Sequence, residues 1–572
     1  MKRITYLILV TIILLSACGG GSQSNVTTTA TTAAATTAAT TTTAAATTEK
    51  QTTAAETTVQ SDEPIWSAPN VLPIVKDTVK YRVLGTYFPG SVPLEENLMM
   101  QEYEGMTNVD IQWESVANDD QQTRLALSLT SGDYPDAYFN FFMSTAQQLI
   151  YGQQGIIIPL QDMIADQGPN VTAIYKLHPD IKSTSTAPDG NIYSLFQYDP
   201  ALHMRTNQKM YINQQWLKDS GYEMPATIEE FADVLRYFRD NDMNGNGDPN
   251  DEIPLAGYKD TDPAKFLINS FILNVNRGLL IVDDKVTPIF NTEEYRDALR
   301  YVNSLYKEGL IGKETYTMDL NSFQAMMNRP EELIVGAVGT SMYQGFFMNI
   351  ELFLDNLGAE TYCPVPPLVG PLGKAQTPYT DDGILVGRSI QITNVAKNPT
   401  ILVKWLDWFY DETNCFWQMN GYEGIDWEYV DEESISGQKP AHKFIPGMNP
   451  DKNRIIMNQG AMYYTNELRY REAKVPGSGG LALYEDSMVY LPFQDMNQKY
   501  LPFTVWQDEE SARTRAQLET MFNDYVNESR ARFVVGELNI ESDWDSYISE
   551  LNAMDLEAYV AIWQKIYDVA NK

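Results

Sequence analysis

The stretch "KYRVLGTYF" (Lys80–Phe88) decides the fold, because its alternation of polar and apolar side chains is typical of a half-buried strand. An amphipathic helix follows with a break near Gly105, and then a second strand at Val109–Val116. A second helix, "DQQTRLALSLTSG", closes at Gly132, and "DAYFN" (Asp136–Asn140) is a short apolar strand. Strands that alternate with helices in this way predict an α/β fold that opens on a parallel sheet.

The same alternation continues further along the chain. In "TIEEFADVLRYFRD" (Thr227–Asp240), Thr227 and Glu230 have the spacing of a capping box, and the apolar residues line one face of a helix. We predict buried strands at "ELIVGAVG" (Glu332–Gly339) and "ILVGRSIQIT" (Ile384–Thr393). A further helix begins at Pro399 and contains Trp405 and Trp408, which we assign to the core, and the C-terminal region is mostly helical.

The N-terminus carries a targeting signal. Lys2 and Arg3 precede an apolar run, Ile4–Leu15, which is shorter than the ~20 residues that a membrane-spanning helix needs. We therefore interpret residues 1–17 as a signal peptide. The following "LSAC" (Leu15–Cys18) resembles the lipobox of bacterial lipoproteins, which predicts cleavage before Cys18 and lipidation of that cysteine. The alternative is an ordinary secretory signal with a chance cysteine.

Residues 18–70 consist largely of threonine and alanine and cannot build a core. We predict a disordered tether that holds the folded part near the membrane surface. A coil of ~45 such residues averages about 35–40 Å between its ends.

Composition limits the partners of the remaining chain. The formal net charge is −35 and no basic patch is evident, so we do not expect nucleic acid as a partner. About 500 residues suggest two or more lobes. Beyond Cys18 there are only Cys363 and Cys415, which could form a disulfide or remain two thiols.

Seven segments follow one another in order over about residues 80–565: "LSLTSGDYPDAYF", "IIIPLQDMI", "APDGNIYSL", "INQQWLKDSGYEMPATIEEF", "DMNGNGDPNDEIPL", "NGYEGIDWEYVD" and "RFVVGELNIESDWDSYISELNAMDLEAYVAIW". With the lipobox, this series resembles the extracellular solute-binding proteins of carbohydrate ABC importers, in the branch related to alginate- and oligosaccharide-binding lipoproteins. The resemblance implies a periplasmic-binding-protein-like fold of type II, with two α/β lobes and a ligand cleft between them.

From the resemblance we expect lobe 1 to comprise residues 76–198 plus about 378–430, and lobe 2 to comprise 199–377 plus about 431–572. The expected partners are an oligosaccharide and the permease subunits of an ABC importer. The expected form is a monomer, anchored by lipid on the extracytoplasmic face of the cell membrane.

The loop within "RYFRDNDMNGNGDPNDEIPL" (Arg236–Leu255) gathers many oxygen donors, which is the ligand chemistry that Ca²⁺ prefers. One register begins at Asp240 and follows the EF-hand pattern with an Asp in the twelfth position. The other begins at Asp242, as in the resembling family, which has one residue fewer before its acidic pair. We predict a structural Ca²⁺ in the second register; the alternative is a solvated turn. The expected ligands are Asp242, Asn244, Asn246, Asp248 through its carbonyl, Asp251 and Glu252.

Sugar sites combine aromatic faces with carboxylates and amides, and in α/β lobes ligands meet the loops that follow strands. The predicted ligand-binding residues are those after strands, those where the chain first crosses between lobes, and the aromatics around the "GYEG" turn, where the resembling family also presents cleft residues. They are Asn140, Phe141, Tyr198, Asp199, Tyr343, Trp417, Tyr422 and Trp427. For each aromatic residue a place in the core is the alternative.

Two other functions are open at this stage. A secreted carbohydrate-cleaving enzyme would need two positioned carboxylates, which composition does not test. However, the chain has no HExxH or GxSxG motif, and His178, His203 and His442 are scattered, so we predict a protein that is not an enzyme. A peptide-binding or adhesin lipoprotein is the second alternative.

Overall fold

The structure is a computed structural model that describes residues 64–88, 91–327, 333–340, 361–380, 383–445, 453–456, 459–476 and 478–571. The signal peptide, Cys18, most of the predicted tether and Tyr343 lie outside the described residues. In the described part of the chain, no helix is both long and apolar enough to cross a membrane.

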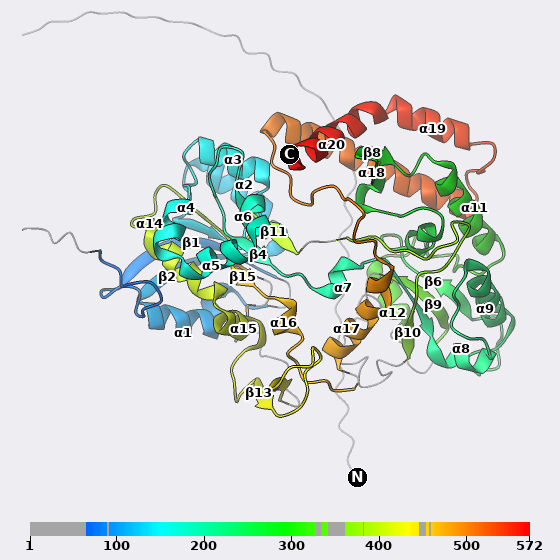
Figure 1. The fold of residues 1–572 in the computed structure, drawn as a ribbon, viewed down its shortest axis with the longest axis horizontal. Helices are drawn as coiled ribbons and strands as arrows, with labels where there is room; N and C mark the ends of the chain where they lie inside the picture. The colour runs from blue at the N-terminus through cyan, green and yellow to red at the C-terminus, as the bar shows by residue number, and fades with distance from the viewer. Residues whose placement is uncertain are drawn as a thin grey trace, which may run out of the picture. The chain divides into compact units, whose positions relative to one another are not determined.

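The first sheet has the strand order β12-β3-β1-β2 (Figure 1). β1 (Val79–Tyr87) runs parallel to β2 (Val109–Ala117) and to β3 (Ala137–Phe139), which confirms the parallel opening predicted from the sequence. β12 (Ile390–Ile392) is antiparallel to β3, so the sheet is mixed.

Helices from both halves of the chain pack around this sheet in one hydrophobic cluster, in which Trp405 is buried as predicted. α1 does not break at Gly105. It continues to Thr107, whose hydroxyl bonds the Tyr103 carbonyl, and ends at Asn108 in the left-handed conformation. The other helices of this region are α2 (Gln121–Ser131), α3 (Thr145–Gln153), α4 (Gln161–Gln167), α5 (Pro169–Leu177), α6 (Pro179–Ser185) and α14 (Pro399–Asp407); α1 spans Leu98–Thr107.

The single strand predicted over residues 384–393 is wrong. The segment forms two strands in different sheets: β11 (Ile384–Val386) pairs with β4 (Phe196–Tyr198), whereas β12 joins the first sheet. Gly387 lies between them with φ +95°, a conformation that other residues rarely adopt and that redirects the chain.

The second sheet has the order β10-β5-β9-β6. β5 (Lys209–Asn213) is antiparallel to β10 (Tyr362–Val365) and to β9 (Val335–Thr340), and β9 is parallel to β6 (Ile253–Ala256). The helices of this part are α8 (Gln214–Ser220), α9 (Ile228–Asp240), α10 (Ala264–Leu267), α11 (Glu293–Lys307), α12 (Leu320–Met327), α18 (Glu509–Val535), α19 (Trp544–Ala553) and α20 (Leu556–Ala570).

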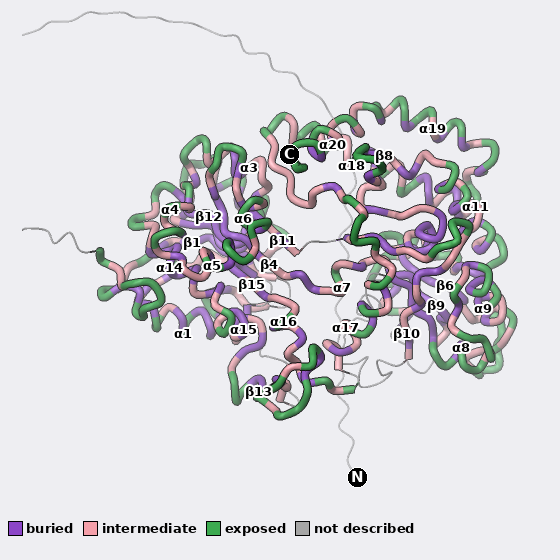
Figure 2. The backbone as a smooth tube through the Cα atoms, viewed as in Figure 1, coloured by how far each residue is buried: buried purple, intermediate pink, exposed green. Residues whose placement is uncertain are grey.

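A second hydrophobic cluster surrounds this sheet and includes the C-terminal helices. In α9 the predicted capping box is present, and Phe231, Val234, Leu235 and Phe238 are all buried. Figure 2 shows buried backbone along both main sheets. The described chain therefore has two separate main cores, each built around one sheet.

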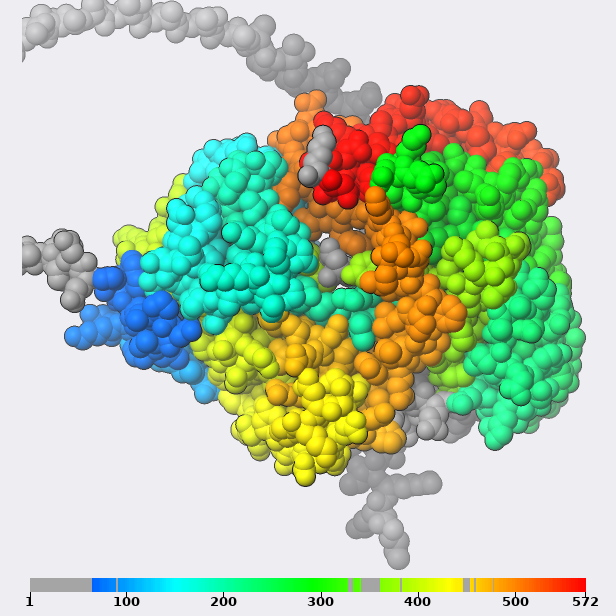
Figure 3. Space-filling view, in the orientation of Figure 1, coloured from blue at the N-terminus to red at the C-terminus, as the bar shows by residue number. Residues whose placement is uncertain are grey.

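Several segments connect the two cores. After β4 the chain passes through α7 (Leu202–Arg205) into β5, and it returns later through β11. It crosses once more between β15 (Met462–Tyr463), which pairs with β4, and α17 (Gly479–Tyr490), which packs against α7 and β10. In Figure 3 the orange residues near the end of this crossing lie against green residues of the second core. The remaining elements are α15 (Glu412–Asn420), α16 (Asn466–Arg469) and two hairpins, β7 (Leu279–Val282) with β8 (Lys285–Pro288) and β13 (Trp427–Val430) with β14 (Ala441–Phe444).

Cys363 and Cys415 are both free thiols, which answers the question that the sequence left open. Burial raises the pKa of the Cys363 thiol to about 11 and that of Cys415 to about 12. Both groups are therefore uncharged and unreactive at neutral pH.

Candidate functional site

Two of the predicted ligand residues are wholly enclosed by protein. Asn140 follows β3 in the left-handed conformation, accepts a hydrogen bond from Arg388 Nε at 3.0 Å and donates one to the Thr86 carbonyl at 3.2 Å. Phe141 packs edge-on against Tyr138 in a small core. Both side chains are 0% exposed, so this structure gives them packing roles rather than contact with a cleft.

Tyr198 and Asp199 lie at the crossing from the first core, as predicted, and are held by protein partners. The Tyr198 ring stacks on Tyr463, with 5.4 Å between ring centroids and 19° between ring planes. Asp199 accepts a hydrogen bond from Arg469 Nη2 at 2.6 Å. These contacts tie together two of the segments that connect the cores.

The three predicted aromatic residues around the "GYEG" turn do come together. Trp417 meets Tyr422 edge-on at 5.1 Å, and both line a cavity of about 280 Å³, which we call the aromatic cavity. Trp427 also borders it but is only 6% exposed, because its Nε1 donates to the Gly421 carbonyl and its ring packs against Phe416. The other lining residues are Glu412, Thr413, Asn414, Phe416, Gly421, Glu423, Tyr429, Leu468 and Arg471.

A second cavity, of about 350 Å³, lies in the region of the second core and was not predicted. Asn207 and Gln208 line it just before β5, and Thr261 lines it in the loop after β6. Because Lys209 pairs with Thr340, the start of β5 lies beside the end of β9. The cavity therefore lies at the carboxyl edge of the parallel pair β6 and β9, where α/β sheets commonly bind ligands.

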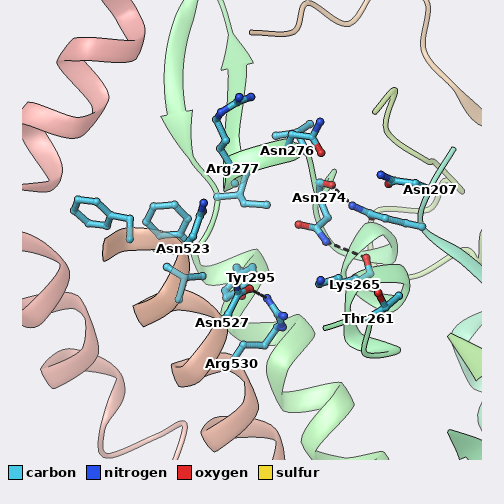
Figure 4. A pocket seen from close by; sticks show the side chains of 17 residues that line it. Asn207, Thr261, Lys265, Asn274, Asn276, Arg277, Tyr295, Asn523, Asn527 and Arg530 are labelled. Carbon is cyan, nitrogen blue, oxygen red and sulfur yellow. Dashed lines mark hydrogen bonds between the residues drawn. The ribbon is translucent and has the colours of Figure 1, made fainter. Parts of the chain in front are cut away.

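Amides dominate the wall of this cavity, which we call the amide cavity. Gln208 and Asn274 are positioned by other protein groups: Gln208 Nε2 donates to the Asn274 carbonyl, and Asn274 Nδ2 donates to the Lys265 carbonyl at 3.0 Å. Asn523 and Asn527 project from α18 on the opposite wall (Figure 4). The six amide residues are Asn207, Gln208, Asn274, Asn276, Asn523 and Asn527.

Amide groups both donate and accept hydrogen bonds, which matches the hydroxyl groups of a sugar. Apolar walls from Ile289, Phe290, Phe522 and Val526 lie beside them, so the cavity combines polar and apolar surfaces as small-molecule sites do. The sequence showed no signal for it, because its residues come from five separate segments and amides follow no periodic pattern.

The oxygen-rich loop between α9 and β6 is closed by its own side chains. Asp242 accepts hydrogen bonds from the backbone of Gly245 and Gly247 at 2.7 and 2.8 Å. Asn246 Nδ2 donates to Asp251 Oδ2 at 2.6 Å, and the Asn246 Oδ1 atom accepts from Asp248 N.

Glu252, the residue before β6, closes the same loop. Its Oε1 atom accepts from Met243 N at 2.7 Å, and its Oε2 atom is buried without a hydrogen-bond partner among the described residues. Desolvation raises the pKa of this carboxyl. Asp240, the last residue of α9, instead pairs with Arg239. The described residues contain no group of three or more His, Cys, Asp or Glu side chains arranged as metal ligands.

Comparison with known proteins identifies the family. The model of the bacterial extracellular solute-binding proteins matches residues 93–414, more than half of the chain, so the chain belongs to this family. The predicted fold class and family are thereby confirmed. The family consists of binding proteins, which also confirms the prediction that the chain is not an enzyme.

The chain is 29% identical over 506 residues to the fructooligosaccharide ABC transporter substrate-binding protein FusA of Streptococcus pneumoniae. The aligned region covers 86% of this chain and 90% of FusA. Solved structures of FusA, one with kestose and one of an EF-hand mutant with fructo-nystose, are 28% identical to this chain and have a TM-score of 0.70. The match covers 86% of this chain and 100% of each solved chain. An extracellular solute-binding protein of Bifidobacterium longum subsp. infantis, 22% identical over 86% of this chain and 99% of its own, has the same fold with a TM-score of 0.72.

Proposed function

We propose that this chain is the extracytoplasmic substrate-binding component of an ABC importer and that it binds an oligosaccharide. The observation that carries the proposal is the similarity to FusA over 86% of this chain, because a solved structure of FusA is a complex with kestose. Family membership supports the binding of a solute outside the cytoplasm. Fructooligosaccharides are therefore the first ligands to test.

The two cores support a two-lobed arrangement in which the ligand is held between the lobes. We assign the first hydrophobic cluster to lobe 1 and the second to lobe 2. The pairing of β15 with β4 favours extending the second part of lobe 1 from residue 430 to about 463. The segments that connect the cores then act as a hinge, and a ligand that touches both lobes favours their closure.

The amide cavity supplies the sugar contacts of lobe 2 in this proposal. Asn523 is a suitable position to test, because its side chain lines the cavity from the surface of α18. Isothermal titration calorimetry of wild type should show binding of kestose or another neutral or acidic oligosaccharide, and small-angle scattering should show compaction. Asn523→Ala should weaken binding by about 1–3 kcal/mol, whereas Asn552→Ala, at an exposed position on α19, should leave it unchanged.

A ligand class other than sugar would contradict the proposal. If a thermal-shift screen shows stabilisation by peptides and by no oligosaccharide, the chain is a peptide binder. If reducing sugar accumulates during incubation with a polysaccharide, the chain has an enzymatic activity that the family does not imply.

Calcium and a membrane anchor complete the proposal. Glu252 Oε2 is a buried oxygen without a hydrogen-bond partner among the described residues. The same loop contains the oxygen donors of Asp242, Asn244, Asn246 and Asp251. These residues therefore fit a Ca²⁺ ion. Asp248 would contribute its carbonyl. The position of Asp240 outside the loop favours the register that begins at Asp242.

A bound Ca²⁺ would neutralise the acidic groups of the loop and stabilise the junction of α9 and β6. We also propose that Cys18 is lipidated and that the tether keeps the protein within reach of the importer's permease subunits on the membrane.

A further inference from the structure

The segment that leads into α18 reaches from the second core to the first. Leu501 is buried in the second hydrophobic cluster and Val505 packs against it, whereas the next residue, Trp506, packs against the first cluster. After Trp506 the chain returns to the second core in α18. In Figure 1 this orange segment lies beside α3, which α18 also contacts. Trp506 therefore fastens the second core to the first by side-chain contact.

Helices beside the first sheet hold Trp506 in place. Its Nε1 donates to the Thr184 carbonyl in α6 at 2.8 Å, and its ring also packs against a small apolar cluster that includes Leu149 of α3. The Val505 carbonyl accepts a hydrogen bond from the Thr145 hydroxyl at the start of α3. A buried ring whose nitrogen also finds an acceptor is fixed in orientation as well as in position. The place of Trp506 is thus set by two helices of the first core.

A continuous series of polar contacts connects the residue after Trp506 with the amide cavity. Gln507 Oε1 accepts a hydrogen bond from Arg515 Nε at 2.7 Å, and Arg515 Nη1 lies 3.0 Å from Glu519 Oε2. The other oxygen of Glu519 lies 2.7 Å from Arg277 Nε, and Arg277 lines the cavity. The series therefore begins beside a residue that contacts the first core and ends at a sugar site proposed for the second.

The inner part of this series is held firmly. Only about one fifth of each of the Arg277, Arg515 and Glu519 side chains is exposed, so solvent screens their charges less than those of a surface pair. Both guanidinium groups also lie over the buried ring of Trp563, at 4.5 Å for Arg277 and 5.3 Å for Arg515.

Arg277 itself has a strained backbone. Its φ is +62°, in the left-handed region that a residue with a long side chain rarely adopts. Such a conformation persists only where the surrounding contacts maintain it. The contacts that hold the Arg277 side chain are those with Glu519 and Trp563. Loosening the series should therefore let Arg277 relax and change the wall of the amide cavity.

We infer that Trp506 is a positioning residue for the amide cavity. Its seat on the first core holds Gln507, which through Arg515 and Glu519 keeps Arg277 in its strained conformation at the cavity wall. This inference rests on the proposed function and adds a route by which the first core affects a sugar site of the second. Because coupling between two sites is reciprocal, an oligosaccharide in the cavity in turn stabilises the seat of Trp506.

The first test compares two tryptophan variants by calorimetry, with whichever of kestose, maltotriose and trigalacturonate binds wild type. Trp506→Ala should weaken binding about tenfold, a typical size for coupling between sites. Trp66→Ala is the matched control, because the Trp66 ring also packs against the first cluster. It should lose stability in urea denaturation without a change in affinity.

Variants of Gln507 separate positioning from packing, because they leave the Trp506 ring intact. Gln507→Leu removes the acceptor of Arg515 and should weaken binding about fivefold to tenfold, whereas Gln507→Glu keeps an acceptor there and should bind as wild type. In wild type, the oligosaccharide should slow amide hydrogen exchange at residues 505–508, and in Gln507→Leu it should not. A role of Trp506 in packing alone would produce neither difference.

Wild-type affinity in Gln507→Leu would overturn the inference, whatever the effect of Trp506→Ala, and would leave the proposed function intact. An equal loss of affinity in Trp66→Ala and Trp506→Ala would also overturn it, since the loss would then follow stability in general. Binding of no glycan by wild type would overturn both the inference and the proposed function.

Discussion

Asp199 and Arg469 form an ion pair, with 2.6 Å between Oδ2 and Nη2, that joins the end of β4 to α16. About one fifth of each side chain is exposed, and Arg469 also lies over the ring of Tyr464. The pair therefore fastens the first connection between the cores, after β4, to the later crossing between β15 and α17. Asp199 is a predicted ligand residue for which the structure provides a protein partner.

Breaking this pair should destabilise the fold. Asp199→Ala leaves the Arg469 guanidinium partly buried and uncompensated, and we expect a loss of about 2–4 kcal/mol in the free energy of unfolding, measured by urea denaturation. The double variant Asp199→Ala with Arg469→Met should recover part of the loss, since the unpaired charge is removed. Losses that simply add in the double variant would show that the two residues do not interact.

His442 should make the protein sensitive to acid. It is 1% exposed, packs edge-on against Phe416 at 4.7 Å, and burial, with the nearby charge of Arg471, lowers its pKa from 6.5 to about 4. The unfolded chain therefore binds a proton at this residue between pH 6.5 and 4 while the folded chain does not. Stability from this group is complete above pH 6.5 and falls by about 3 kcal/mol as the pH drops to 4.

His442→Phe should remove this dependence. We expect the urea midpoint of the variant to change less than that of wild type between pH 6.5 and 4.5. Equal slopes in both proteins would assign the acid sensitivity to other groups.

Local patterns in the sequence were sufficient for most of the fold. The β1 strand, the α2 helix ending at Gly132 and the capping box of α9 each depend on contacts within a few residues, so they could be predicted. The break of the predicted strand at Gly387 could not be predicted, because its two halves pair with strands of two different sheets.

The residues of the candidate site were harder to predict from the sequence, because they too depend on contacts between distant segments. Trp417 and Tyr422 are neighbours in sequence and line one cavity, whereas Asn207 and Asn523 meet in the amide cavity from positions 316 residues apart. An aromatic residue also does not reveal from sequence whether its ring faces solvent, and Trp427 proves to be largely buried.

Trp417 and Trp427 should therefore respond differently to truncation. Trp427→Ala removes a buried ring and should cost about 3–5 kcal/mol of stability. Trp417→Ala opens a partly exposed wall of the aromatic cavity and should cost about 1–2 kcal/mol, since fewer contacts are lost. Thermal and urea unfolding measure both, and equal losses would contradict the difference in burial.

The membrane anchor depends on one thiol. Cys18→Ala should release the protein into the medium or leave its signal peptide uncleaved, because the acyl chains have no other attachment site in the "LSAC" motif. Cell fractionation and mass spectrometry of the N-terminus measure this. A variant that is processed and remains in the membrane fraction like wild type would refute the anchor.

Removal of Ca²⁺ should lower the melting temperature if the loop between α9 and β6 binds the ion. Binding to the folded state alone stabilises it by about 2.7 kcal/mol when free Ca²⁺ is a hundredfold above the Kd. EDTA should abolish this stabilisation in wild type, and Asp242→Ala with Glu252→Gln should melt identically with and without EDTA.

Asp240→Asn is the matched control, because Asp240 pairs with Arg239 outside the loop, and it should respond to EDTA as wild type does. A response to EDTA that is lost with Asp240→Asn would favour the register that begins at that residue, and no response in wild type would leave the loop a turn held by its own hydrogen bonds.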